Sequence, residues 1–298
     1  MMNNFLNELE LRAAIVNDSL EQYLPPEDTY PPLIHQAMRY SLFAGGKRLR
    51  PVLVLSAAEI VSGESRHVLP AACALELIHT YSLIHDDLPA IDNDDFRRGR
   101  PTSHCVYGEA IAVLAGDALL TLAFELLTCE DMEQHIPADR LLQAAREIAR
   151  ASGTMGLIGG QVMDILTTDK DMDGSTLEYI YLNKTGALYR AAVRAGAILA
   201  GAGANELLAL TGFAEHLGLA FQIKDDLLDI EGEEARLGKA TGSDLKNKKF
   251  TYPVLFSIEK ARQKAAQSIS AAKDKLTVFD ERADFMRRLA DFVINRDF

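Results

Sequence analysis

Two clusters of aspartates occur at spacings that could hold a metal ion. The first lies in HTYSLIHDDLPAIDNDDFRRGRPT and contains Asp86, Asp87 and Asp92. Asp92 would point away from Asp86 on a regular helix, but Pro89 favours a bend that could bring it back beside Asp86. A solvated acidic loop is the alternative, although it fits poorly directly after the apolar residues 75–84. We therefore treat this cluster as a candidate metal site.

The second cluster lies in FQIKDDLLD. Gln222, Asp225, Asp226 and Asp229 follow the spacing i, i+3, i+4 and i+7, which places them on one helix face. Like charges stacked in this way repel one another unless a cation holds them, although an exposed charged stripe remains the alternative. Two carboxylate clusters with few His or Cys residues nearby are typical of hard-cation sites. Mg²⁺ is favoured because it uses few carboxylates and leaves positions for phosphate oxygens.

Basic residues gather in the segment GGKRLRP. Lys47, Arg48 and Arg50 lie between a glycine turn and an expected helix N-terminus, a position that favours an anion. An exposed basic patch is the alternative. His79 lies two helical turns before Asp86, so a functional role and a buried core histidine are both open for it.

Two other segments carry weaker signals. NKTG places Lys184 and Thr185 beside a glycine that permits close approach, and GGQVMD places Gln161 and Asp164 three residues apart. An exposed lysine and a structural polar pair are the respective alternatives. Lys239, in a polar loop, is uninformative in isolation.

Long Ala- and Leu-rich segments with helical spacing must position these residues, and strand signals are weak. No linker or internal repeat interrupts the chain, which predicts one all-α domain over residues 1–298. We expect the polar stretch Glu231–Lys249 to form a mobile loop. The expected helices are Asn4–Leu24, Pro32–Ala44, Pro51–Ser62, Val68–Leu88, His104–Leu127, Ala138–Met155, Thr176–Leu199, Asn205–Ile230, Tyr252–Leu276 and Asp280–Asn295.

Composition limits the compartment and the partners. The 298 residues carry a net charge of −12, which argues against nucleic acid or an anionic membrane as a partner. Three scattered cysteines and no signal-like segment at the N-terminus favour a reducing, cytoplasmic location. The most apolar stretch, Ala110–Leu127, has Asp117 near its middle, so we expect a buried core helix rather than a membrane span.

The ordered motifs resemble those of a known family. DDLPAID followed by NDDFRRGRPT resembles the first aspartate-rich motif of trans-polyprenyl diphosphate synthases, and QIKDDLLD resembles the second. GGKRLRP, IHTYSLIHDD, GGQVMD, the Lys184–Thr185 pair and GKATGSDLKNKKFTYP resemble further family segments, in the family order. The resemblance runs from about Ala44 to Leu255 and is nearest to bacterial farnesyl diphosphate synthases.

The resemblance implies an all-α, single-domain isoprenoid-synthase helical bundle around a deep central cavity, with three Mg²⁺ ions per active site. It assigns Asp86, Asp92 and Asp225 as direct metal ligands. Supporting carboxylates would be Asp87, Asp226 and Asp229. The allylic diphosphate would contact Arg97, Lys184, Thr185, Gln222 and Lys239, and isopentenyl diphosphate would contact Lys47, Arg50, His79 and Arg98. Catalysis would depend on Asp86, Asp92, Arg97, Lys184, Asp225 and Lys239.

The implied reaction joins isopentenyl diphosphate to dimethylallyl and then geranyl diphosphate. Metal and basic groups stabilise the departing diphosphate, the resulting carbocation is attacked by the isopentenyl double bond, and a proton is lost. The family pattern makes an aromatic residue shortly before the first motif the floor of the cavity. Tyr81, with Ser82 beside it, therefore predicts a fifteen-carbon product, (2E,6E)-farnesyl diphosphate.

Several alternatives remain open. A twenty-carbon geranylgeranyl product would follow if Tyr81 fails as a floor. A terpene cyclase is disfavoured by QIKDDLLD, and a non-catalytic regulatory partner is disfavoured because both aspartate-rich motifs are intact. A Mg²⁺-dependent hydrolase outside prenyl chemistry is the remaining alternative. The resemblance also implies a homodimer.

Overall fold

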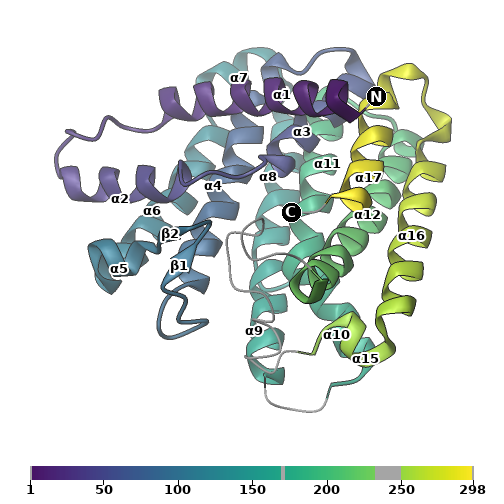
Figure 1. The fold of residues 1–298 in the computed structure, drawn as a ribbon. Coiled ribbons are helices and arrows are strands. Elements are labelled where there is room, and N and C mark those ends of the chain that lie inside the picture. Colours follow the sequence, from purple (N-terminus) through teal and green to yellow (C-terminus); the bar gives the residue numbers. More distant parts are fainter. Residues whose placement is uncertain (1, 169–171, 232–249, 297–298) are drawn as a thin grey trace.

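The protein is a single all-α domain, which confirms the expected fold class (Figure 1). The computed structural model describes residues 2–168, 172–231 and 250–296. Within these ranges the strands are the two-residue β1 (Phe96–Arg97) and β2 (Arg100–Pro101), which pair as an antiparallel hairpin. The helices before this hairpin are α1 (Met2–Tyr23), α2 (Pro32–Leu42), α3 (Leu49–Ser62), η1 (Arg66–Val68) and α4 (Leu69–Asp86).

The later helices complete the bundle. They are α5 (Ser103–Tyr107), α6 (Glu109–Leu127), α7 (Glu130–His135), α8 (Ala138–Ser152), α9 (Leu157–Thr167), α10 (Gly174–Ile180), η2 (Tyr181–Thr185), α11 (Gly186–Ala200) and α12 (Ala204–Glu231). After residues 232–249 follow α15 (Tyr252–Phe256), α16 (Ile258–Lys275), η3 (Leu276–Val278), η4 (Glu281–Ala283) and α17 (Asp284–Asn295). The predicted mobile loop, Glu231–Lys249, lies outside the described residues except for Glu231.

The core consists of helices that are buried on nearly all sides. α11 packs against α3, α8 and α12, while α4 packs against α3 and α6. α3 and α11 touch backbone to backbone, because a Cβ at Gly196 would lie 2.1 Å from the carbonyl oxygen of Val54. These inner helices are apolar because they bury residues all round. They fix the carboxyl-terminal ends of α4 and α12, where the two aspartate clusters lie.

The helix expected over Ala110–Leu127 forms, but only one of its faces is buried in the core. α6 packs Ala115, Leu119 and Ala123 into the core, but Leu114 is 53% exposed and Val113 is 38% exposed. Within the described residues, two helical stretches, Arg66–Asp86 and Glu109–His135, are long and apolar enough to span a membrane by length and composition. The most apolar 18-residue part of each is 78% and 39% buried, respectively. Apolar content alone did not distinguish a helix packed on one side from one packed on all sides.

Three expected helices are interrupted. Gly108, with φ of 82°, separates α5 from α6, and Ser257, with φ of 128°, separates α15 from α16. Helical spacing continues through both positions, so the pattern did not reveal these breaks. The third interruption is η2, a π-helical segment between α10 and α11. α7 and α9 were not predicted as helices.

Candidate active site

The first aspartate cluster lies where α4 ends and the chain folds back on it. The Asp92 N–H donates to the Asp86 carbonyl at 2.9 Å, and the Asp94 N–H donates to the Asp87 carbonyl at 3.2 Å. This confirms that the chain around Pro89 returns Asp92 beside Asp86. Burial raises the pKa of Asp86 to about 6, and the neighbouring Asp92 adds to the rise while Lys184 opposes it. Two carboxylates crowded in this way favour a bound cation.

Asp87 has a different role from Asp86. It is buried and accepts from Arg97, whose Nε lies 2.8 and 2.9 Å from its two carboxylate oxygens and whose Nη2 lies 2.5 Å away. The bidentate geometry fixes the plane of the Arg97 guanidinium. Asp87 therefore positions Arg97, a side chain that we predicted to contact a diphosphate.

The second cluster lies on one face of α12, but its members differ in environment. Asp226 is buried and accepts from the Tyr181 hydroxyl, from Gln222 Nε2 at 3.1 Å and from the Tyr252 N–H at 3.1 Å. Asp229 is also buried. The Asp225 side chain is 41% exposed and forms an ion pair with Arg296. Asp225 is thus the most accessible carboxylate of this cluster.

Lys184 and Thr185 lie in η2, where the helix widens into a π turn. Lys184 Nζ donates to Asp164 at 2.5 Å, and Thr185 Oγ1 donates to Gln222 at 2.7 Å. α9 can approach because a Cβ on Gly160 would lie 2.2 Å from the Lys184 nitrogen. Such π turns often mark functional sites. We expected an ordinary helix here, and the π turn instead directs both side chains toward α9 and α12.

These residues enclose a pocket of about 180 Å³. It is lined by the second aspartate cluster and by η2, with Asp164, Lys184, Thr185, Gln222, Asp225 and Asp226 among its walls. Lys239, also predicted to lie here, is outside the described residues. This acidic pocket has the donors and carboxylates that a metal-bound anion requires.

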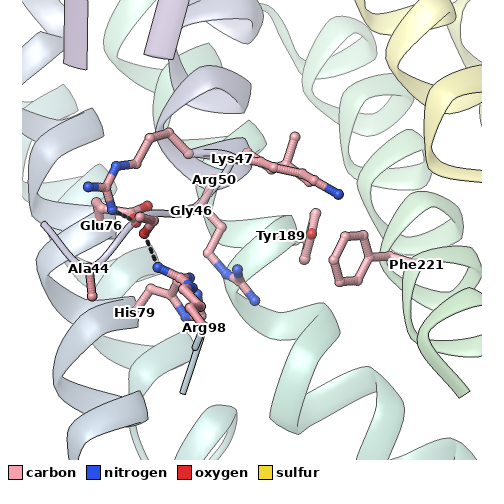
Figure 2. Close-up of a pocket in the computed structure, with 12 residues that line it drawn as sticks. Ala44, Gly46, Lys47, Arg50, Glu76, His79, Arg98, Tyr189 and Phe221 are labelled. Carbon is pink, nitrogen blue, oxygen red and sulfur yellow. Dashed lines mark hydrogen bonds and ion pairs between the residues drawn. The ribbon is translucent and has the colours of Figure 1, made fainter. Parts of the chain in front are cut away.

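A second, basic pocket of about 530 Å³ lies beside α3 and α4 (Figure 2). It contains all four side chains that we predicted for a second diphosphate, namely Lys47, Arg50, His79 and Arg98, and is otherwise lined by Ala44, Gly45, Gly46, Arg48, Leu49, Glu76, Tyr189 and Phe221. The two pockets adjoin on α12, where Phe221 lines the basic pocket and Gln222 the acidic one.

The cations of the basic pocket are held close together and partly away from water. Burial, together with the charge of Arg296, lowers the pKa of Lys47 to about 8. Burial and the surrounding arginines, Arg50 first among them, hold the pKa of His79 well below its usual range. The buried Nε of Arg50 has no hydrogen-bond partner among the described residues. An anion in this pocket would relieve each of these costs.

Two glycines and a buried ion pair determine how the arginines are arranged in this pocket. Arg98 donates to the Gly45 carbonyl and lies against Gly46, where a Cβ would come within 2.6 Å of its Nη1. Arg48 also lines the pocket, but its guanidinium is held by other groups of the protein. It is buried and donates to Glu76 and to the Leu42 carbonyl, each at 2.7 Å. Of the three basic residues in GGKRLRP, Arg48 therefore has a structural role, whereas Lys47 and Arg50 remain candidates for anion binding.

The residues predicted to set chain length lie on α4. Tyr81 is 5% exposed, its ring meets that of His85 edge-on at 5.6 Å, and its hydroxyl has no partner in the described part of the chain. The Ser82 hydroxyl donates a hydrogen bond to the His79 carbonyl at 2.8 Å.

Sequence reasoning missed Arg296, whose guanidinium contacts Asp225 and lies 3.9 Å from the centroid of the Phe221 ring. A single arginine near the C-terminus offered no signal of that contact.

A model of the polyprenyl synthetase family matches residues 31–284. The chain belongs to the polyprenyl synthetase family. It is 46% identical to the farnesyl diphosphate synthase of Geobacillus stearothermophilus, over 99% of this chain and 98% of that protein. It is 45% identical to the geranylgeranyl diphosphate synthase of Cyanophora paradoxa, over 99% and 97% of the two chains. The solved geranylgeranyl pyrophosphate synthetase of Pyrococcus horikoshii superposes with a TM-score of 0.90, at 30% identity and 99% coverage of both chains.

Family membership confirms the resemblance stated from the motifs. The chain is a trans-prenyl diphosphate synthase, a prenyltransferase that acts on isoprenoid diphosphates. The names of the relatives divide between fifteen-carbon and twenty-carbon products.

Proposed function

We propose that this polyprenyl synthetase condenses isopentenyl diphosphate with dimethylallyl and then geranyl diphosphate to give (2E,6E)-farnesyl diphosphate. The observation that supports this most is the pair of adjoining pockets on α12, one lined by carboxylates and the other by basic side chains. A protein that holds two diphosphates in different ways needs one site built for a metal and another built for direct ion pairing.

In this proposal the acidic pocket binds the allylic diphosphate. The donor set fits Mg²⁺, because Asp86, Asp92 and Asp225 offer carboxylate oxygens and the first two are brought together by the backbone. When bound, Mg²⁺ would neutralise the charge on the departing diphosphate. Lys184 and Thr185 line the acidic pocket together with Asp225, and the charge of Lys184 also acts on Asp86, so these two side chains would hold the diphosphate oxygens.

Arg97, Gln222 and Lys239 complete the proposed allylic contacts. Asp87 holds Arg97 in one orientation, so little side-chain entropy is lost when that arginine binds an anion. Gln222 accepts from Thr185 and donates to Asp226, which fixes its amide at the wall of the pocket.

The basic pocket would receive isopentenyl diphosphate. Lys47, Arg50 and Arg98 supply charge, and His79, neutral because its pKa is lowered, can donate one hydrogen bond and accept another. The isopentenyl double bond then attacks the allylic carbon, and a proton is lost. No side chain in the motifs is an evident base, so the released diphosphate is the proposed proton acceptor.

Tyr81 supports a fifteen-carbon product. It lies on α4 five residues before Asp86, about one turn below the metal face, and its ring is held by packing against His85. An extending chain would meet this ring. The geranylgeranyl alternative is kept because similar proteins carry both product names.

We also propose a homodimer built through α6. Its outward face carries exposed Val113, Leu114 and Phe124, an apolar surface on a helix whose other face is already packed. A second copy of this chain is the proposed occupant, because a two-fold axis would bury the same patch on both subunits.

Diphosphate release tests the proposed reaction. Purified protein is mixed with geranyl diphosphate and Mg²⁺, and inorganic diphosphate is followed with and without isopentenyl diphosphate. Condensation predicts that release requires isopentenyl diphosphate, because coupling traps the carbocation. Release that is equally fast without it indicates a hydrolase or cyclase, and no release under either condition refutes the enzyme assignment. Asp131→Asn, at an exposed position on α7, is a control that should behave as the parent does.

A further inference from the structure

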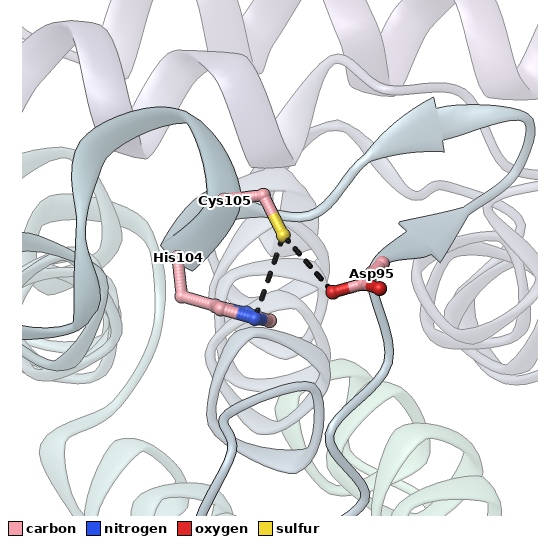
Figure 3. Close-up of side chains that lie close together, drawn as sticks. All are labelled: Asp95, His104 and Cys105. Atoms are coloured by element: carbon pink, nitrogen blue, oxygen red, sulfur yellow. Dashed lines mark hydrogen bonds between the residues drawn. The ribbon is translucent and has the colours of Figure 1, made fainter.

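We propose that Asp95, His104 and Cys105 form a binding site for a divalent transition-metal ion, best suited to Zn²⁺, at the base of the β1–β2 hairpin (Figure 3). None of the three is a residue of the diphosphate sites described above. The ligand atoms all lie within 4.8 Å of one another. The proposal goes beyond prenyl transfer and does not depend on it.

The distances from the Cys105 sulfur to the other two ligand atoms match a tetrahedral zinc site. Cys105 Sγ lies 3.5 Å from His104 Nε2 and 3.5 Å from an Asp95 carboxylate oxygen. Zinc bonds of about 2.3 Å to sulfur and about 2.0 Å to nitrogen or oxygen, at the tetrahedral angle, separate the ligand atoms by about 3.5 Å. The two distances from Cys105 Sγ therefore already match those that the ion requires, the third pair lies within 4.8 Å, and a water molecule can take the fourth position.

Thr102 orients the histidine for this role. Its hydroxyl donates to the Asp94 carbonyl at 2.8 Å and lies 3.1 Å from His104 Nδ1. A hydroxyl has one hydrogen, so while it donates to Asp94 it accepts from Nδ1–H. The neutral imidazole then presents its lone pair on Nε2, which faces Cys105. Outer hydrogen bonds of this kind are typical of metal-binding histidines.

The chemistry of the ligands separates this site from the aspartate-rich motifs. A thiolate and an imidazole favour Zn²⁺, Co²⁺ or Cu²⁺, whereas Mg²⁺ prefers sites made of oxygen alone. Asp95 and Cys105 are exposed, so an ion can enter from solvent. An open fourth position and this exposure predict a reversible site rather than a permanently filled one.

The location links the ion to two arginines that are assigned to diphosphate binding. Asp95 directly precedes β1, and His104 and Cys105 follow closely after β2, so one ion would join the two ends of the hairpin. The hairpin and its turn carry Arg97, held by Asp87, and Arg98, which lines the basic pocket. We infer that the bound metal stiffens the segment that carries both arginines.

Cobalt spectroscopy tests the site directly. The metal-free full-length protein, without substrates, is titrated with Co²⁺ in the presence of excess Mg²⁺, which occupies oxygen-only sites. The expected result is one Co²⁺ per chain with a thiolate-to-cobalt charge-transfer band, displaced by Zn²⁺. Cys105→Ser should abolish the band. His104→Gln and Asp95→Asn should each weaken binding at least tenfold, because even outer-shell changes cost about 10- to 100-fold.

The matched control is Cys129→Ser, a half-buried cysteine away from the cluster. It should keep both the band and the affinity of the parent protein. The absence of a charge-transfer band in the parent, a band that survives in Cys105→Ser, or an unchanged affinity in Asp95→Asn would each overturn the proposal. Because no prenyl substrate is used, this result is independent of the proposed condensation.

Discussion

Gly46 gives a sharp test of how the basic pocket is built. The substitution Gly46→Ala places a Cβ 2.6 Å from Arg98 Nη1 and 2.9 Å from its Cζ, at a residue with φ of 129°. The guanidinium is the end of a flexible side chain, so it will move rather than tolerate the clash. Moving it breaks its bond to the Gly45 carbonyl and takes its charge away from the anion position.

The expected magnitude follows from one charge-assisted hydrogen bond between Arg98 and the diphosphate. Such a bond contributes about 1.5–3 kcal/mol, which corresponds to a roughly 10- to 150-fold weaker binding. We therefore expect the KM for isopentenyl diphosphate to rise by that factor. The KM for geranyl diphosphate should change little, because that substrate is assigned to the other pocket.

The assay is steady-state kinetics with each substrate varied while the other is saturating. Gly45→Ala is the matched control, because Gly45 also has positive φ, of 99°, but a Cβ there meets nothing within 4 Å. It shares the backbone strain without the contact with Arg98. If both variants raise the KM for isopentenyl diphosphate equally, the strain alone is responsible and the reasoning about Arg98 is refuted.

Three further predictions address other parts of the site. Asp86→Ala should lower turnover at least about a hundredfold through lost charge stabilisation, and near-normal activity in a coupled diphosphate-release assay would exclude Asp86 as a metal ligand. Tyr81→Ala should lengthen the product, and an unchanged product profile by mass spectrometry would place the floor elsewhere. The pKa of His79 is lowered in the folded state, so as the pH falls below about 6.5 the unfolded chain protonates this histidine before the folded chain does. The free energy of unfolding should therefore decline there, by up to about 1.4 kcal/mol per pH unit for this one group. Urea unfolding at a series of pH values should show a flatter decline for His79→Gln, and identical slopes would contradict the buried neutral histidine.

The helical bundle was predictable because its signals are local. Inner helices such as α3 and α4 are apolar nearly all round, and this pattern is written in consecutive residues. The return of Asp92 to Asp86 was also predictable, since Pro89 lies between them. In each case the cause lies within a few residues of its effect.

The contacts between distant segments could not be predicted in this way. Lys184 pairs with Asp164, which lies on another helix, and the π turn that aims it depends on how closely α9 approaches at Gly160. Arg296 reaches Asp225 across 71 residues of sequence. Packing between helices determines both contacts, and no local pattern of residues encodes that packing.

The central claim is that two adjoining pockets hold two isoprenoid diphosphates so that their prenyl groups are joined, and that Tyr81 limits the length of the product. The most direct measurement supplies the purified protein with Mg²⁺, dimethylallyl diphosphate and excess isopentenyl diphosphate, and identifies the products by mass spectrometry. The account predicts farnesyl diphosphate as the main product, with geranyl diphosphate as a transient intermediate. A mainly twenty-carbon product would contradict the role of Tyr81, and the absence of any extended prenyl diphosphate would contradict the account as a whole.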